Sequence, residues 1–483
     1  MEETESKGLK EYIKGIKFTL SDFLLMFGFL FSIPFYAFAW KFMVTSDPST
    51  IYFDNRMIIA CFVLVIASWA TYFILEIKAG RIKNHLFLWV YVFLAILAVI
   101  TVLVQKTTNI FYVECKIADL QTAKHYPGTQ VGDIVKVVAT ISPTHKLFFA
   151  CATFVITTIF YIVLIVLPKR IQNMNFLVII GIITMVFMVG MCIYSYITEA
   201  DKYIPFVKSF FTGDGEKMKK YAMTSFVVMS VPYGVCMMLA FLFALLAHTI
   251  TKKSFWYFPA IFYLINMLFS YCRTSIAISY ILFTMYVVFR LAATFKQHKI
   301  RNSIVLSLVA IVFISLIIFS IISFSTEGSL FTPIYNHLKS FSNMRSYEKR
   351  KIIWHNIRDE LKGGWIVLGR GFGTHNVMLY PMNLVNGDNV APSHSTYYAI
   401  LGAGGLISLL GFFGLMAYYV VLFIKSLKFS KTMPVLLSFG LIGFLAYSFT
   451  EGVNYLVVTF AFPLILYYNI KVKDNIKTPN ACA

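Results

Sequence analysis

Apolar runs of about 20 residues recur along the whole length of this 483-residue chain. A helix needs about 20 apolar residues to cross a bilayer core, where backbone polar groups can be satisfied only within the helix or in a closed barrel. We therefore expect an all-α, polytopic membrane protein. About twelve runs reach this length, and they are residues 20–43, 57–77, 85–104, 147–167, 174–196, 224–248, 254–270, 275–293, 303–323, 397–424, 433–450 and 454–470.

Composition supports this class. With 59% hydrophobic and 13% charged residues, the chain has more apolar surface than a water-soluble fold can bury, so lipid has to cover much of it. Two pairs of runs leave the count open, because the pair that flanks Arg273 and the final pair can each be interpreted as one long interrupted segment.

Basic residues predict the orientation, because Lys and Arg in short loops are retained on the cytoplasmic side. They cluster before the first run and in every second connection after it, whereas the opposite short loops hold only Arg56 and Arg273. Both termini are therefore expected in the cytoplasm. Because the formal charge of +20 is divided among these clusters, nucleic acid is not an expected partner. The clusters lie within residues 7–17, 78–83, 169–170, 252–253, 290–301, 425–431 and 471–477.

This scheme predicts three regions. Residues 1–323 would hold spans one to nine with outer loops at 105–146 and 197–222, residues 324–396 a large extracytoplasmic loop, and residues 397–483 the last three spans and a cytoplasmic tail. Loop 105–146 has strand-like character at 133–141 and is interpreted as a surface cap.

Loop 197–222 departs from the charge rule, because it carries five lysines that four acids offset only in part. Either the topology changes there, or a basic outer surface serves a purpose. We favour the second interpretation, because the first would invert every basic cluster downstream. The lysines are Lys202, Lys208, Lys217, Lys219 and Lys220.

The large loop 324–396 contains a predicted basic helix. It begins near Ser346 and ends at Gly363 and Gly364, since a hydroxyl residue often caps the start of a helix and glycine its end. One side carries an apolar stripe (Ile353, Ile357, Leu361, with Trp354 beside it), and the rest is basic (Arg350, Lys351, Arg358, Lys362). Such a helix lies at a membrane interface, with its cations toward headgroups or toward an anionic ligand.

A glycine-rich turn, residues 368–373, follows this helix, and His394 then stands at the mouth of the tenth span. An imidazole with an ordinary pKa of about 6.5 can accept a proton near neutral pH. The sequence shows no metal-ligand spacing, phosphate-binding glycine loop or nucleophile elbow, so neither a metal nor a cofactor is expected.

Four motifs in order resemble those of the O-antigen ligase and O-antigen polymerase family, which comprises membrane glycosyltransferases that move glycans from a polyprenyl diphosphate carrier. They are Ser-Tyr-Cys-Arg-Thr-Ser at 270–275, Arg-x-x-x-Trp at 350–354, Leu-Gly-Arg-Gly-Phe-Gly at 368–373, and His-Ser-Thr-Tyr-Tyr at 394–398. This sequence departs from the family's pattern at two points, which bear on the acceptor and on the placement of the diphosphate. Lys219 and Lys220 stand nearest to where the family usually has an arginine in an earlier outer loop, and Ser395 replaces the commoner asparagine.

The resemblance implies that Arg273 and Arg350, with Lys219 or Lys220, hold the diphosphate. Planar guanidinium groups can grip phosphate oxygens at two points without a metal. A charged residue at membrane depth indicates a functional site, although an arginine that snorkels from a helix end is the plain alternative for Arg273.

The resemblance also implies that His394 accepts or orients the proton of an acceptor hydroxyl, which attacks the anomeric carbon with inversion. Glu451 would orient His394 or a cation, or would be an ordinary interface acid. The expected partners are a polyprenyl-diphosphate-linked glycan, a glycan or lipid acceptor, and membrane lipids, with the site on the outer face of a bacterial cytoplasmic membrane. The sequence does not distinguish a polymerase from a ligase. The alternative class of protein is a multi-span transporter or lipid-linked glycan flippase.

Overall fold

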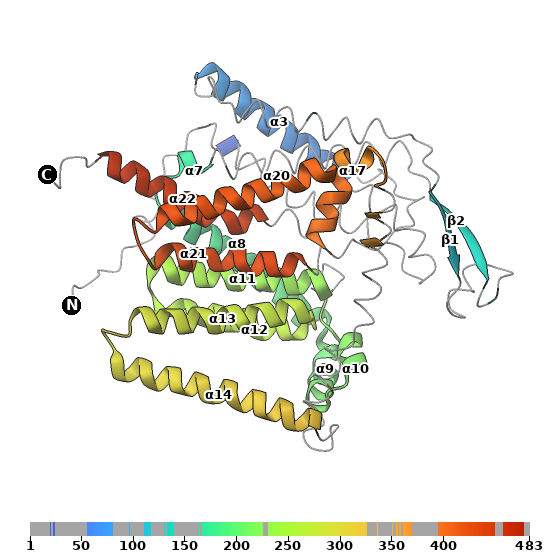
Figure 1. Ribbon diagram of the computed structural model, residues 1–483, viewed down its shortest axis with the longest axis vertical. Helices are drawn as coiled ribbons and strands as arrows, with labels where there is room; N and C mark the ends of the chain where they lie inside the picture. The colour runs from blue at the N-terminus through green and yellow to red at the C-terminus, as the bar shows by residue number, and fades with distance from the viewer. Residues whose placement is uncertain are drawn as a thin grey trace. The chain divides into compact units, whose positions relative to one another are not determined.

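The computed structural model describes residues 56–80, 111–116, 133–139, 167–225, 230–325, 361–369, 395–449 and 457–477, with isolated residues that include Arg350, Trp354 and Ile357. Within this part helices dominate, as the predicted all-α class requires, and the strands form one two-stranded antiparallel pair (Figure 1). The elements are α3 (Arg56–Lys78), β1 (Phe111–Lys116), β2 (Ile134–Ala139), α7 (Leu167–Arg170), α8 (Asn175–Thr198), α9 (Ala200–Thr212), α10 (Gly215–Lys220), α11 (Ser230–Thr251), η4 (Ser254–Trp256), α12 (Tyr257–Phe269), α13 (Arg273–Ala293), α14 (Lys299–Ser325), α17 (Trp365–Leu368), α20 (Thr396–Ser426), α21 (Met433–Ser448) and α22 (Val457–Lys477).

Four helical stretches in this described part are long and apolar enough to cross a membrane: Asn175–Thr198, Tyr233–Thr251, Arg273–Ala293 and Gly404–Ser426. The chain is thus a helical membrane protein. Ser254–Phe269 and Met433–Ser448 are apolar but shorter. At 1.5 Å per residue, the 16 residues of α21 reach about 24 Å, somewhat less than the thickness of a hydrocarbon core.

Most of the predicted spans coincide with helices. Those at 57–77, 174–196, 224–248, 254–270, 275–293, 303–323, 397–424, 433–450 and 454–470 fall on α3, α8, α11, α12, α13, α14, α20, α21 and α22. The predicted spans at 20–43, 85–104 and 147–167 lie almost entirely outside the described residues.

The pair of runs that flanks Arg273 forms two helices rather than one. Helix α12 ends at Phe269 and α13 begins at Arg273. Between them Tyr271 has a φ of 49°, which no residue in a right-handed helix adopts.

The predicted tenth span is wrong as a continuous helix, because α20 is broken at Gly404 and Gly405. Gly405 has φ 62° and ψ −159°. A Cβ atom there would lie 2.3 Å from the carbonyl oxygen of Val367 and 2.7 Å from the amide of Gly369. Only glycine fits both the conformation and the close approach. A short helix from Thr396 therefore precedes the long apolar stretch, and the ribbon turns sharply between them in Figure 1.

The chain packs as two compact units. Unit 1 comprises residues 1–173, 349–422 and 448–483, and unit 2 comprises residues 174–348 and 423–447. In unit 1, β1 and β2 pair with Phe111 opposite Ala139 and Lys116 opposite Ile134. This confirms strand structure within residues 133–141, whereas β1 was not predicted from the sequence.

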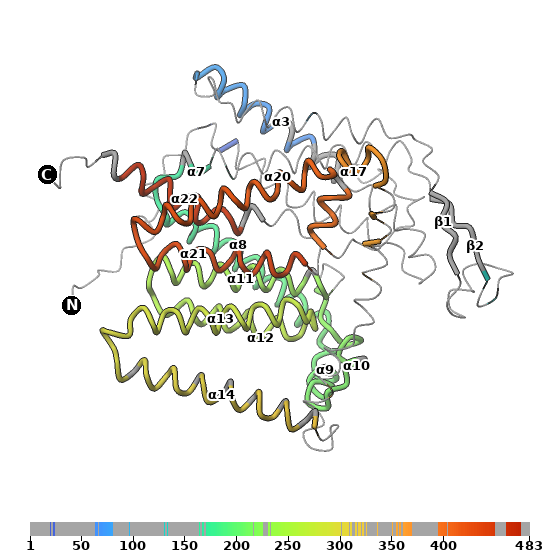
Figure 2. Tube along the Cα trace, in the orientation of Figure 1, coloured from blue at the N-terminus to red at the C-terminus, as the bar shows by residue number. Residues whose placement is uncertain are grey.

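In unit 2, α11 packs against both α8 and α12. Small residues allow the close contacts: Gly181 on α8 faces the Phe243 ring, and a Cβ atom on Gly234 of α11 would lie 2.6 Å from that of Cys272. Figure 2 follows this path from α8 through α13. The core includes Tyr233, Met237, Phe241, Tyr263 and Met267, each at most 1% exposed.

Candidate functional site

The junction between α12 and α13 is held by its own side chains. The Ser270 hydroxyl donates to the Met267 carbonyl at 2.6 Å and accepts from the Cys272 amide at 3.1 Å. These bonds flank Tyr271, whose positive φ is costly for a residue with a side chain and persists because the surroundings enforce it. The junction is therefore a fixed turn at the end of the bundle.

Arg273 begins α13 and rests on Tyr271. Its Cζ lies 5.0 Å from the centre of the Tyr271 ring, and its Nη2 donates to the Tyr271 hydroxyl at 3.0 Å. The side chain is half-buried. The unusual backbone of Tyr271 thus serves to place an aromatic ring against the guanidinium. The same end of α13 carries the positive pole of the helix dipole, so both favour an anion there.

Lys219 and Lys220 lie at this same end of unit 2. They occupy the last turn of α10, and both are exposed. The Met223 amide, three residues beyond Lys220, donates to the Phe269 carbonyl at 2.8 Å, and Phe269 precedes Arg273 by four residues. The structure therefore brings the predicted lysines and Arg273 to one end of the unit, where Figure 1 shows α9 and α10 beside the ends of α12 and α13.

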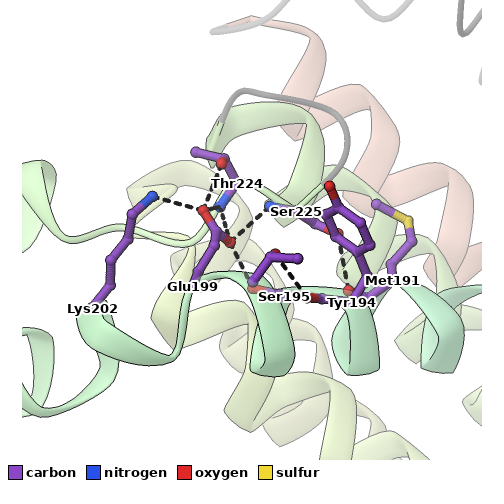
Figure 3. A network of polar contacts seen from close by, with 8 residues as sticks. Met191, Tyr194, Ser195, Glu199, Lys202, Thr224 and Ser225 are labelled. Atoms are coloured by element: carbon purple, nitrogen blue, oxygen red, sulfur yellow. Dashed lines mark hydrogen bonds and ion pairs between the residues drawn. The ribbon is translucent and has the colours of Figure 1, made fainter.

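A buried carboxylate fastens this region to α8. Glu199 follows α8 directly, is 7% exposed, and lies at the centre of the network in Figure 3. It accepts hydrogen bonds from the hydroxyls of Ser195 at 2.7 Å and Thr224 at 2.8 Å, and from the amides of Thr224 at 3.1 Å and Ser225 at 2.9 Å. The Lys202 ammonium pairs with it at 2.7 Å. Glu199 thus ties the end of α8 to the segment that leads into α11.

The surroundings of Glu199 strongly favour its ionised form over its protonated form. Burial alone would raise the pKa of this carboxyl, but the bonds from Lys202, Ser225, Ser195 and Thr224 outweigh it and lower the pKa from 4.5 to about 2. Ser225 is the second strained residue of this region, with a φ of 54°, and its hydroxyl also donates to the Met191 carbonyl at 2.9 Å.

The sequence interpretation did not single out Glu199. It treated this acid as one of four that offset the loop lysines. The available signal was its place directly after an apolar run, with Lys202 one helical turn later.

The predicted basic helix of loop 324–396 belongs to unit 1. Its residues are helical at Arg350, Trp354 and Ile357, and it ends at Gly363 with a φ of 70°, as predicted. Ile357 and Leu361 have no exposed surface. The part of the stripe that the structure describes is therefore covered by protein rather than open to lipid.

That cover comes mainly from α20. Trp354 stacks on Tyr398 with ring centres 5.0 Å apart and an angle of 5° between the planes, and Leu401 and Trp365 pack on the same cluster. Arg350 lies one helical turn before Trp354 along the chain. Gly369, in the glycine-rich turn 368–373, approaches the break in α20 at Gly405. Segments 350–354 and 394–398 thus meet within unit 1, and Gly369 of the glycine-rich turn lies against α20 at Gly405.

His394 and Glu451 lie outside the described residues, as do positions 370–375 of the glycine-rich turn and its surroundings. Unit 2 thus places Arg273, Lys219 and Lys220 at one end, and unit 1 brings the Arg350 helix to the start of α20. In the described ranges no group of three or more His, Cys, Asp or Glu side chains is placed to hold a metal ion.

Comparisons of the chain with protein-family models, with curated proteins and with solved structures gave no match.

Proposed function

We propose that this protein transfers a glycan from a polyprenyl diphosphate carrier to an acceptor hydroxyl at the outer face of a bacterial cytoplasmic membrane. The observation that carries this proposal is the placement of Arg273 on Tyr271 at one end of an apolar helical bundle, at the same end as Lys219 and Lys220. A half-buried guanidinium at the same end of the unit as exposed ammonium groups suits a lipid-linked anion.

The chemistry needs such a group of cations. The bond between the anomeric carbon and the diphosphate oxygen breaks while a new bond forms from the acceptor oxygen to that carbon. The electron pair of the broken bond stays on the diphosphate, so Arg273 and Arg350, helped by Lys219 or Lys220, stabilise the leaving group. His394 takes the proton of the acceptor hydroxyl, and direct displacement inverts the anomeric carbon. Glu451 would orient His394.

The proposed topology has twelve spans and both termini in the cytoplasm. The basic clusters between the runs support it through the charge rule. In this arrangement the α12–α13 junction, α9 and α10 face outward, and so does the loop at 324–396. A polymerase would pass the glycan to another lipid-linked glycan, and a ligase to a different acceptor, by the same donor chemistry.

Reconstitution tests the proposal. The protein is placed in liposomes with a polyprenyl-diphosphate oligosaccharide and candidate acceptors, and new glycosidic bonds and released carrier are measured. We expect both products with the wild type and neither with Arg273→Ala or His394→Ala. Lys253→Ala, which removes an exposed cation from the opposite end of unit 2, is the control and should retain activity.

Two results would contradict the proposal in different ways. Activity that survives both substitutions would refute the assignment of the site. Movement of the intact lipid-linked glycan across the bilayer without a new bond would instead support the flippase alternative.

A further inference from the structure

Helix α9 carries apolar residues on two opposite sides. On one side Phe206 is 2% exposed and packs against Phe269 at the end of α12, with ring centres 5.6 Å apart. On the other side Ile204 and Phe211 are 69% and 71% exposed. Packing within unit 2 explains the apolar residue on the inner side, whereas the apolar residues on the outer side are left exposed.

The outer side is a narrow stripe. At about 100° per residue, Ile204, Val207 and Phe211 fall within an arc of about 60°, whose centre lies about 130° around the helix from Phe206. Lys208 stands at the edge of this stripe and is exposed. A lysine beside an apolar stripe can bury its methylene stem in an apolar layer while its ammonium reaches phosphate groups.

Exposed apolar residues also lie near the end of α8, the helix that precedes α9. That helix is apolar and long enough to cross a membrane, and near its end Ile193 and Ile197 are 52% and 73% exposed. Glu199 then breaks the helix, and α9 crosses the bundle end (Figure 1). Exposed apolar residues on a helix of membrane-spanning length and on the transverse helix after it are what the boundary between acyl chains and headgroups requires.

We propose that α9 lies in the outer bilayer interface, with Ile204, Val207 and Phe211 among the acyl chains and Lys208 at lipid phosphates. In this position α9 fixes how deep the adjoining end of unit 2 lies in the bilayer. Because Glu199 ties α9 to α8 and Phe206 ties it to α12, the α12–α13 junction is held at the level of the headgroups. This consequence gives the basic loop 197–222 a role that does not depend on the proposed glycan transfer.

Site-directed spin labelling in the intact protein tests the depth. A keto-phenylalanine replaces Ile204, Phe211 or Asp201 in turn and is coupled to a nitroxide, so that the native cysteines are unchanged. Asp201 is the control, because it is exposed on the same helix but belongs to its polar edge. The protein is placed in phosphatidylcholine nanodiscs, and accessibility to oxygen and to a water-soluble nickel chelate is measured.

We expect labels at 204 and 211 to favour oxygen, and the label at 201 to favour nickel. Nickel access at 204 and 211 equal to that at 201 would show that the stripe faces water. Low access to both reagents would show that a second copy or another protein surface covers it. Either result would overturn the proposal, and the two label positions report independently if one variant fails to fold. Because no glycan is present, this outcome is separate from that of the transfer assay.

Discussion

Replacing Glu199 by glutamine should destabilise unit 2 by at least about 3 kcal/mol. The magnitude follows from the lowering of the Glu199 pKa from 4.5 to about 2, at about 1.4 kcal/mol for each tenfold change in proton affinity. Glutamine has the same shape but loses the charge that pairs with Lys202. Its amide nitrogen would also point a donor at either the Lys202 ammonium or the Thr224 and Ser225 amides, so one buried donor would lose its acceptor in either orientation.

Thermal unfolding in detergent with a thiol-reactive dye measures this, because Cys192 and Cys272 carry buried thiols that react only when the helices separate. On the scale of domains of 150–250 residues, 3 kcal/mol lowers Tm by about 6 °C or more. Asp201→Asn makes the same change of charge two residues away on an exposed side chain, and should shift Tm by less than about 1–2 °C.

The pH dependence supplies a second check. A carboxyl with a lowered pKa in the folded state stabilises the protein above its unfolded pKa, and this contribution is lost as pH falls toward the folded pKa. The difference between wild type and Glu199→Gln should therefore stay constant from pH 7 to about 5, shrink below pH 4.5, and nearly vanish by pH 2. A variant as stable as wild type at pH 7, or a difference unchanged at pH 3, would refute the reasoning.

Three further predictions concern the junction and the motif segments. Gly405→Ala should abolish folding or lower the free energy of unfolding by several kcal/mol in the same dye assay, because a Cβ atom there would lie 2.3 Å from backbone. Gly411→Ala is the control: nothing lies within 4 Å of its Cβ position, so this variant should be neutral or slightly stabilising. Trp354→Leu should lower the free energy of unfolding by at least about 1 kcal/mol, because it removes the stacking on Tyr398. Tyr398→Phe keeps the aromatic ring and should lower it by less than about 0.5 kcal/mol. Equal losses in the two variants would contradict this reasoning. Arg273→Lys keeps the charge but loses the planar fork, so it should lower the rate of glycan transfer about 10- to 100-fold with Tm unchanged, and full activity would show that a point charge suffices.

Much of the helical framework could be predicted, because lipid demands long apolar runs and those runs are visible in the sequence. The ends of α8 and α13 fall within a few residues of their expected positions. The break in α20 was missed because Gly404 and Gly405 stand inside an apolar run, and their conformation depends on contact with Val367 and Gly369 from another segment.

The site was predictable only in part, for a related reason. Arg273 stood out as a lone cation between two apolar runs, and its position at the start of α13 agrees with that reasoning. Glu199 did not stand out, because its donors come from residues 195, 202, 224 and 225 and assemble only in the fold. The stripe at Ile357 and Leu361 was expected to face lipid, since periodicity identifies an apolar side but not what covers it.

The most direct test of the central claim measures two products in the same liposomes: free polyprenyl diphosphate and new glycosidic bonds. Transfer with diphosphate as the leaving group predicts one carrier released for each bond formed, with both lost together in Arg273→Ala. Carrier release without bond formation, or bond formation that persists in Arg273→Ala, would contradict it.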